Sequence, residues 1–173
     1  TSTLILIAAL VLTACTSKED KAKLIYPQSK VWAHRVNDTT TAKDKSKLFG
    51  GLEIDLHYEE TENALFVGHD TCEANNRITF QQWLEVIDNP QEHSFWLDIK
   101  NLNNANTTKI TAILNNLIEN HKLQDRIIVE SPDTKALKTV KKSGIAVSKW
   151  IDMNGITNDT ASWLQKHTDE IGR

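Results

Sequence analysis

The stretch Leu52-Glu53-Ile54-Asp55-Leu56 decides the fold of this chain, because it combines a strand pattern with two carboxylates. Successive side chains of a β-strand point to opposite faces, so Glu53 and Asp55 share one face and the three aliphatic residues share the other. His57 lies on the acidic face, one step further out, at the expected rim of a site. A solvent-facing edge strand is the alternative explanation of this alternation, but the aliphatic residues favour a buried strand.

Three further short apolar runs are followed or interrupted by residues that carry chemistry. They are Val31-Trp32-Ala33 before His34-Arg35, Leu65-Phe66-Val67 before His69-Asp70, and Phe95 to Ile99, which contains Asp98 and precedes Lys100. Side chains at the carboxyl ends of parallel barrel strands converge on one mouth, where the catalytic groups of such barrels gather. We therefore expect these residues to meet at one end of a sheet.

Strands and helices alternate along the chain. Thr79-x-x-Gln82 is a capping box, an i, i+3, i+4 apolar stripe runs from Ile110 to His121, and Ser131-Pro132-Asp133 opens a helix that Gly144 ends. The remaining expected elements are helices over 41–49 and 159–171 and strands over 126–129 and 145–149. This alternation predicts an α/β fold with a parallel sheet, either doubly wound or closed as a barrel.

The N-terminus predicts an export signal. Residues 4–13 are apolar apart from the last, and Leu12-Thr13-Ala14-Cys15 resembles the bacterial lipobox, in which Cys15 becomes the lipidated first residue. We expect a lipoprotein signal peptide over 1–15, a polar tether over 16–24 and a barrel domain over 25–173. An apolar N-terminal strand or helix with an incidental cysteine is the alternative. A lipid on Cys15 implies attachment to the bacterial cell envelope, facing the periplasm or the outside.

Length and charge bound the possible functions. The formal net charge is −3 and no basic stripe stands out, so nucleic acid is not an expected partner. A complete eight-stranded barrel usually takes about 250 residues, whereas this chain has 173 and stops inside a helical pattern. We therefore expect an incomplete barrel, truncated at its C-terminus, with an open α/β sheet as the alternative.

The ordered motifs resemble those of the glycerophosphodiester phosphodiesterases, in the superfamily of phospholipase-C-like phosphodiesterases. That family has His-Arg, Glu-x-Asp, His-Asp and an acidic residue two before a lysine, and this chain has His34-Arg35, Glu53-x-Asp55, His69-Asp70 and Asp98-x-Lys100. Where the family usually continues with glycine and then Pro-Glu-Asn-Thr, this chain has Val36-Asn37-Asp38-Thr39, which looks closer to the sphingomyelinase D and menorin-like branches. The resemblance implies a TIM-barrel-type fold and a phosphodiester hydrolase acting on glycerophosphodiesters or phospholipid-type substrates.

Five residues are expected to form the reactive centre. Glu53, Asp55 and Asp98 offer oxygen ligands to one hard divalent cation, Mg²⁺ or Ca²⁺, and the resemblance assigns the same three positions. His34 and His69 resemble the family's acid/base pair. An unperturbed imidazole titrates near ~6.5, which suits proton transfer in both directions at neutral pH.

Other residues are expected to contact the substrate. Arg35 offers two parallel donors to phosphate oxygens, and Lys100 offers a compact charge against developing negative charge. A plain ion pair with Asp98 is the alternative for Lys100. Glu130 is a further candidate for substrate or metal contact, and Asn37 is a candidate cation ligand through its amide oxygen.

Three functions are compatible with this pattern. The first is a lipid-anchored, metal-dependent phosphodiesterase, in which hydrolysis and cyclising transfer both stay open. The second is a non-catalytic ligand-binding lipoprotein on the same scaffold, because a fold does not fix a function. The third is a structural lipoprotein, which leaves the charged strand ends unexplained. The intact set of motifs favours the enzyme.

Overall fold

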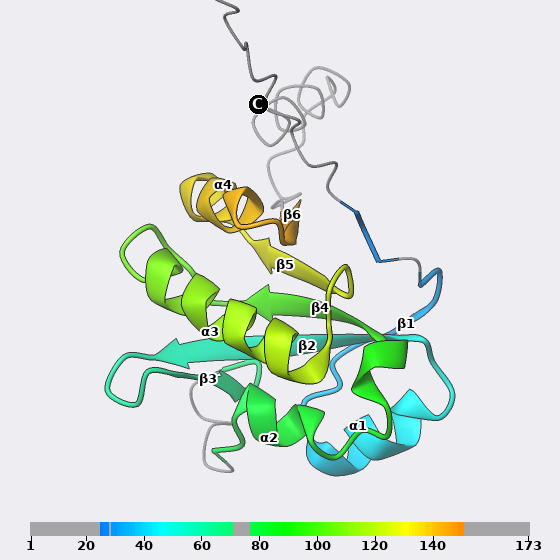
Figure 1. Ribbon diagram of the computed structural model, residues 1–173. Coiled ribbons are helices and arrows are strands. Elements are labelled where there is room, and N and C mark those ends of the chain that lie inside the picture. Colours follow the sequence, from blue (N-terminus) through cyan, green and yellow to red (C-terminus); the bar gives the residue numbers. More distant parts are fainter. Residues whose placement is uncertain (1–24, 28, 71–76, 151–173) are drawn as a thin grey trace, which may run out of the picture.

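The computed structural model describes residues 25–27, 29–70 and 77–150, and a sheet of mostly parallel strands lies at its centre (Figure 1). The strand order is β1-β2-β4-β5-β6, and β3 pairs antiparallel with β2. The bounds are β1 (Trp32–Ala33), β2 (Gly51–Glu59), β3 (Ala64–Val67), β4 (Ser94–Ile99), β5 (Ile127–Ser131) and β6 (Ala146–Lys149). All pairings along the main path are parallel, so the predicted α/β class is confirmed.

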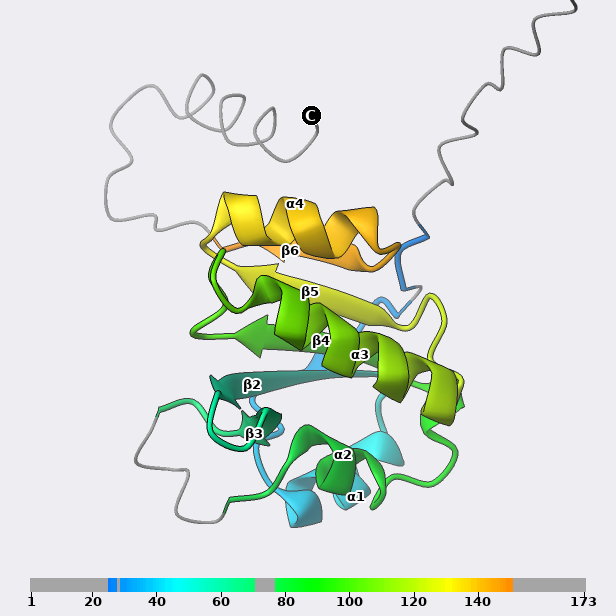
Figure 2. The ribbon, with the colours of Figure 1, turned by 60° about the vertical axis from the view of Figure 1, so that its left-hand side comes forward.

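Helices connect these strands. They are α1 (Thr39–Ser46), α2 (Phe80–Leu84), the 3₁₀ turn η2 (Pro90–Glu92), α3 (Thr107–His121) and α4 (Thr134–Lys142). Figure 2 shows α3 and α4 side by side on one face of the sheet, with α1 and α2 near its β1–β3 end. Within the described ranges, no helix combines the length and the apolar character needed to cross a bilayer.

Capping residues set where the helices begin. The expected capping box is present at α2, where the Thr79 side chain accepts from the Gln82 N–H and the Gln82 side chain accepts from the Thr79 N–H. The helix predicted over 41–49 instead spans 39–46. It starts earlier because the Asp38 side chain accepts from the Thr41 N–H at 2.8 Å. It ends earlier because the chain turns after Ser46, where the N–H groups of Leu48 and Phe49 both donate to the Lys45 carbonyl.

The alternation of β2 and its neighbours builds the core on the helical side. Leu52, Ile54 and Leu56 are fully buried, as are Phe95, Leu97 and Ile99 on β4. Each such side chain contributes roughly 1.5–3 kcal/mol by burial. Trp83 of α2 packs against Phe95 and donates its indole N–H to the Val36 carbonyl at 2.9 Å. The residues between these aliphatic positions, such as Glu53 and Asp55, therefore point to the opposite face of the sheet.

Other predicted boundaries shift by one to three residues. The strands predicted over 126–129 and 145–149 are β5 and β6, and the helix with the apolar stripe begins at Thr107. β5 extends to Ser131 because that residue pairs with Lys149. The predicted signal peptide with Cys15, the polar tether and the helix over 159–171 lie outside the described residues.

Candidate active site

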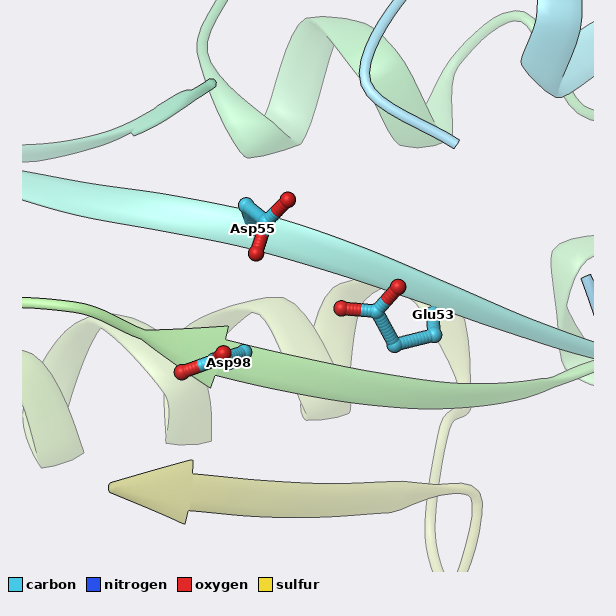
Figure 3. Close-up of side chains that lie close together, drawn as sticks. All are labelled: Glu53, Asp55 and Asp98. Carbon is cyan, nitrogen blue, oxygen red and sulfur yellow. The ribbon is translucent and has the colours of Figure 1, made fainter. Parts of the chain in front are cut away.

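Parallel pairing places polar side chains in register across four strands. Asp55 of β2 lies beside Asp98 of β4, which lies beside Glu130 of β5 and then Ser148 of β6. Glu53 precedes Asp55 by two residues and points to the same face. Figure 3 shows Glu53, Asp55 and Asp98 projecting from the two neighbouring strands. One carboxylate oxygen of each lies within 4.8 Å of the others, a spacing at which one cation could contact all three.

These carboxylates line a cavity of about 630 Å³. The structure brings eight of the predicted site residues to this cavity, and Asn37 is not among its lining residues: they are His34, Arg35, Glu53, Asp55, His69, Asp98, Lys100 and Glu130. Among the described residues, the lining also includes four that the sequence did not indicate as site residues: Trp32, Trp96, Pro132 and Trp150. The expected convergence at the carboxyl ends of the strands is therefore present in the structure.

Lys100 is the central cation among these acids. Its Nζ lies 2.6 Å from Asp55 Oδ1 and 2.5 Å from Asp98 Oδ2, so it pairs with two carboxylates rather than with Asp98 alone. Burial alone would raise the pKa of Asp55, but hydrogen bonds from Lys100 and Asn37 outweigh it and hold that pKa below its usual value. Burial opposes the charge of Lys100, yet the same two carboxylates raise its pKa.

The segment that follows β1 contacts the carboxylate of Glu53. The Arg35 N–H donates to Glu53 Oε2 at 2.6 Å, and His34 Nε2 lies 3.6 Å from the same oxygen. Arg35 has φ 55°, a left-handed conformation that costs roughly 1–2 kcal/mol for a non-glycine residue. Burial raises the pKa of Glu53, and the Arg35 N–H only partly offsets that effect. Glu53 is therefore easier to protonate than Asp55, whose pKa is lowered.

Glu130 extends the acidic row onto β5. Its Oε2 accepts the indole N–H of Trp96 at 3.0 Å. Burial raises the pKa of Glu130, and hydrogen bonds from Ser148 and Trp96 act in the opposite direction. The rings of Trp96 and Trp32 make a T-shaped contact, with an interplanar angle of 87° and centroids 5.6 Å apart. The two tryptophans therefore give the cavity an aromatic side next to its carboxylates.

Asn37, expected as a cation ligand, instead forms hydrogen bonds with Asp55. Its Nδ2 donates to Asp55 Oδ2 at 2.7 Å, and its Oδ1 accepts from the Asp55 N–H at 3.1 Å. Both polar atoms of the amide are engaged with the same residue, so Asn37 orients the carboxylate. The sequence predicts a role for Asn37 at the site, but only the three-dimensional structure shows its contact with Asp55.

We predict that Asn37→Ala weakens cation binding by roughly 10–100-fold, the usual effect of losing a residue that orients a ligand. Asn101→Ala is a control, because Asn101 also pairs with one residue by two hydrogen bonds, here with the backbone N–H and carbonyl of Tyr58 and not with a carboxylate. Isothermal titration of Mg²⁺ or Ca²⁺ measures both variants. Equal affinities in Asn37→Ala and Asn101→Ala would show that the Asn37 contact does not orient Asp55 for a cation.

Comparisons with solved structures show that the fold of this chain is a known one. A scan against protein-family models gave no match, and a search of curated proteins found no relative. Among solved structures, a protein from Galdieria sulphuraria, provisionally described as a glycerophosphodiester phosphodiesterase, is 13% identical with TM-score 0.57. The alignment covers 86% of this chain and 74% of that one.

A second protein, from Silicibacter pomeroyi DSS-3, is provisionally described as a glycerophosphoryl diester phosphodiesterase. It is 12% identical, with TM-score 0.54, and the alignment covers 83% of this chain and 74% of that one. Identity at this level shows the fold, which is the α/β fold of TIM-barrel type that these proteins share. The predicted fold class is therefore confirmed.

Proposed function

We propose that this chain is a metal-dependent phosphodiester hydrolase that acts on glycerophosphodiesters or phospholipid-derived diesters. One observation carries the proposal: three carboxylates whose oxygens lie within 4.8 Å share a cavity with two basic side chains and two histidines. The shared fold of proteins described as glycerophosphodiester phosphodiesterases supports it, although a fold alone does not define an activity.

The charge of the cavity fits a divalent cation. Within the part of the chain that the structure describes, the lining holds four carboxylates together with Arg35 and Lys100, so the formal charge of these groups is −2 when all are ionised and the histidines are neutral. That charge repels a phosphodiester anion, and a divalent cation would cancel it. Glu53, Asp55 and Asp98 would hold the ion, because Mg²⁺ and Ca²⁺ prefer carboxylate oxygens. When bound, the ion would polarise a phosphoryl oxygen.

The chain's own residues would bind the diester and move its protons. Arg35 and Lys100 would face the phosphate oxygens, where their charges offset the negative charge that develops during reaction. One of His34 and His69 would accept the proton of the attacking hydroxyl, and the other would protonate the leaving oxygen. The attacking hydroxyl would belong to water or to the substrate itself. Glu130, beside Trp96, would contact the alcohol portion of the substrate.

The proposal includes attachment to a membrane surface. A lipid on Cys15 would hold the exported enzyme on the bacterial cell envelope, facing the periplasm or the outside. Each buried methylene of such a chain contributes ~0.8 kcal/mol to membrane binding. Phospholipid-derived diesters are concentrated at that surface, so the anchor would bring the cavity to its substrate. Nucleic acid is not among the proposed partners.

A substrate panel tests the function. The full chain is incubated with glycerophosphocholine, glycerophosphoethanolamine, glycerophosphoglycerol and lysophospholipids, with Mg²⁺ or Ca²⁺, and the phosphorus products are separated. A phosphomonoester indicates hydrolysis, and a cyclic phosphate indicates transfer to the substrate's own hydroxyl. If a diester binds but is not converted, the chain is a ligand-binding lipoprotein and not an enzyme. If no diester is bound or converted, both the enzyme and the ligand-binding proposals fail.

A further inference from the structure

His57 makes a contact that its position at the rim of the site does not suggest. Its Nε2 lies 3.1 Å from the backbone carbonyl oxygen of His69, and the side chain is half-buried. A carbonyl oxygen only accepts hydrogen bonds, so the Nε2 atom of His57 carries the proton and donates it. The side chain of one histidine thus binds the main chain of another.

This contact is the second of two that tie the same segment to β2. The ladder between β2 and β3 ends where Leu56 pairs with Val67. Immediately afterwards, the Gly68 N–H donates to the Asp55 carbonyl at 3.0 Å. Gly68 has φ 154°, a conformation that L side chains rarely adopt, so the chain turns here as glycine allows. The bond from His57 then fixes the next residue.

We infer that His57 is a positioning residue, which holds the backbone of His69 so that the imidazole of His69 keeps its place in the cavity. The inference rests on the proposed function, in which His69 transfers a proton. β2 would then fix the carboxylate of Asp55 directly and His69 through His57. Misplacement of a reacting group by about 1 Å can lower a rate by ~10²-fold, so one hydrogen bond at this point has a measurable effect.

Three variants of the full chain test this role. His57→Leu removes the donor and should lower kcat about tenfold or more, with KM nearly unchanged, because the cavity that binds the substrate is retained. His57→Gln should recover most of the activity, since its amide nitrogen reaches the place of Nε2. His57→Asn puts its amide nearer the place of Nδ1 and should behave as a milder loss. If His57→Leu does not fold, His57→Asn is measured in its place.

His93→Leu is the matched control. The Nδ1 atom of His93 lies 3.2 Å from the Phe49 carbonyl oxygen, just before β4 and β2 begin. It is the same kind of histidine-to-carbonyl contact, but at the ends of the strands opposite the cavity. Its loss should affect stability and leave kcat at the wild-type value.

Amide hydrogen exchange gives a readout that does not need activity. In His57→Leu, the Gly68 and Asp70 amides should exchange about tenfold faster than in the wild type, whereas His57→Gln and His93→Leu should leave them unchanged. If the wild type converts no diester, the proposed function fails, and the exchange rates alone decide on His57. Wild-type exchange in His57→Leu, or equal kcat values for His57→Leu and His57→Gln, would overturn the inference.

Discussion

His34→Asn and His69→Asn each lower turnover of a phosphodiester by ~10²–10⁴-fold, the range that positioned acid/base groups contribute. Each variant binds the cation almost as tightly as the wild type, because the proposed ligands are carboxylates on β2 and β4. Steady-state kinetics with the best diester of the panel measures the loss, and isothermal titration measures the cation affinity. The largest effect is expected in kcat.

His121→Asn is the control for these two variants. His121 is the last residue of α3 and does not line the cavity. Its variant should match the wild type in kcat and KM. If His34→Asn and His69→Asn keep wild-type turnover, the acid/base assignment is wrong, although a metal-dependent enzyme would remain possible on the carboxylates alone.

Asp55→Asn and Asp98→Asn lose tight cation binding, by roughly 100-fold or more. A hard cation depends on the number of charged oxygen ligands, and each variant removes one of three. Asp55 is the more sensitive position because its side chain is only 2% exposed, whereas that of Asp98 is 15% exposed. Isothermal titration with Mg²⁺ and Ca²⁺ measures the affinity, and kcat should fall together with the occupancy of the site.

Asp44→Asn is the matched control for the carboxylates. Asp44 is 71% exposed on α1 and pairs only loosely, at 3.6 Å, with Lys47. This variant should bind the cation as the wild type does. Unchanged affinity in both Asp55→Asn and Asp98→Asn would exclude the proposed cation site.

Much of the fold follows from local pattern. The alternation from Leu52 to Leu56 is enough to predict a strand with one acidic face, since side-chain direction has a period of two. Adjacent parallel strands then bring Asp55 and Asp98 into the same row. The proximity of these groups could therefore be predicted from the sequence, because strand direction and register decide it and loop conformation does not.

Contacts that depend on tertiary placement could not be predicted. Asn37 and Asp55 are 18 residues apart, and no periodicity states that the amide of one will bind both the carboxylate and the N–H of the other. The left-handed backbone of Arg35 is equally hidden, because arginine has no preference for that conformation. His57 was expected only as a rim residue for the same reason. The start of α1, in contrast, is predictable from local sequence, because Asp38 is a preferred N-cap residue directly before it.

Phosphorus-31 NMR of the full chain with a glycerophosphodiester tests the central claim most directly. The diester resonance should convert to a monoester or cyclic phosphate when Mg²⁺ or Ca²⁺ is present. Conversion should stop when a chelator in excess is added and resume when the cation is restored. Conversion that continues at the same rate after exhaustive chelation, or no conversion of any diester with either cation, would contradict a metal-dependent phosphodiesterase built on Glu53, Asp55 and Asp98.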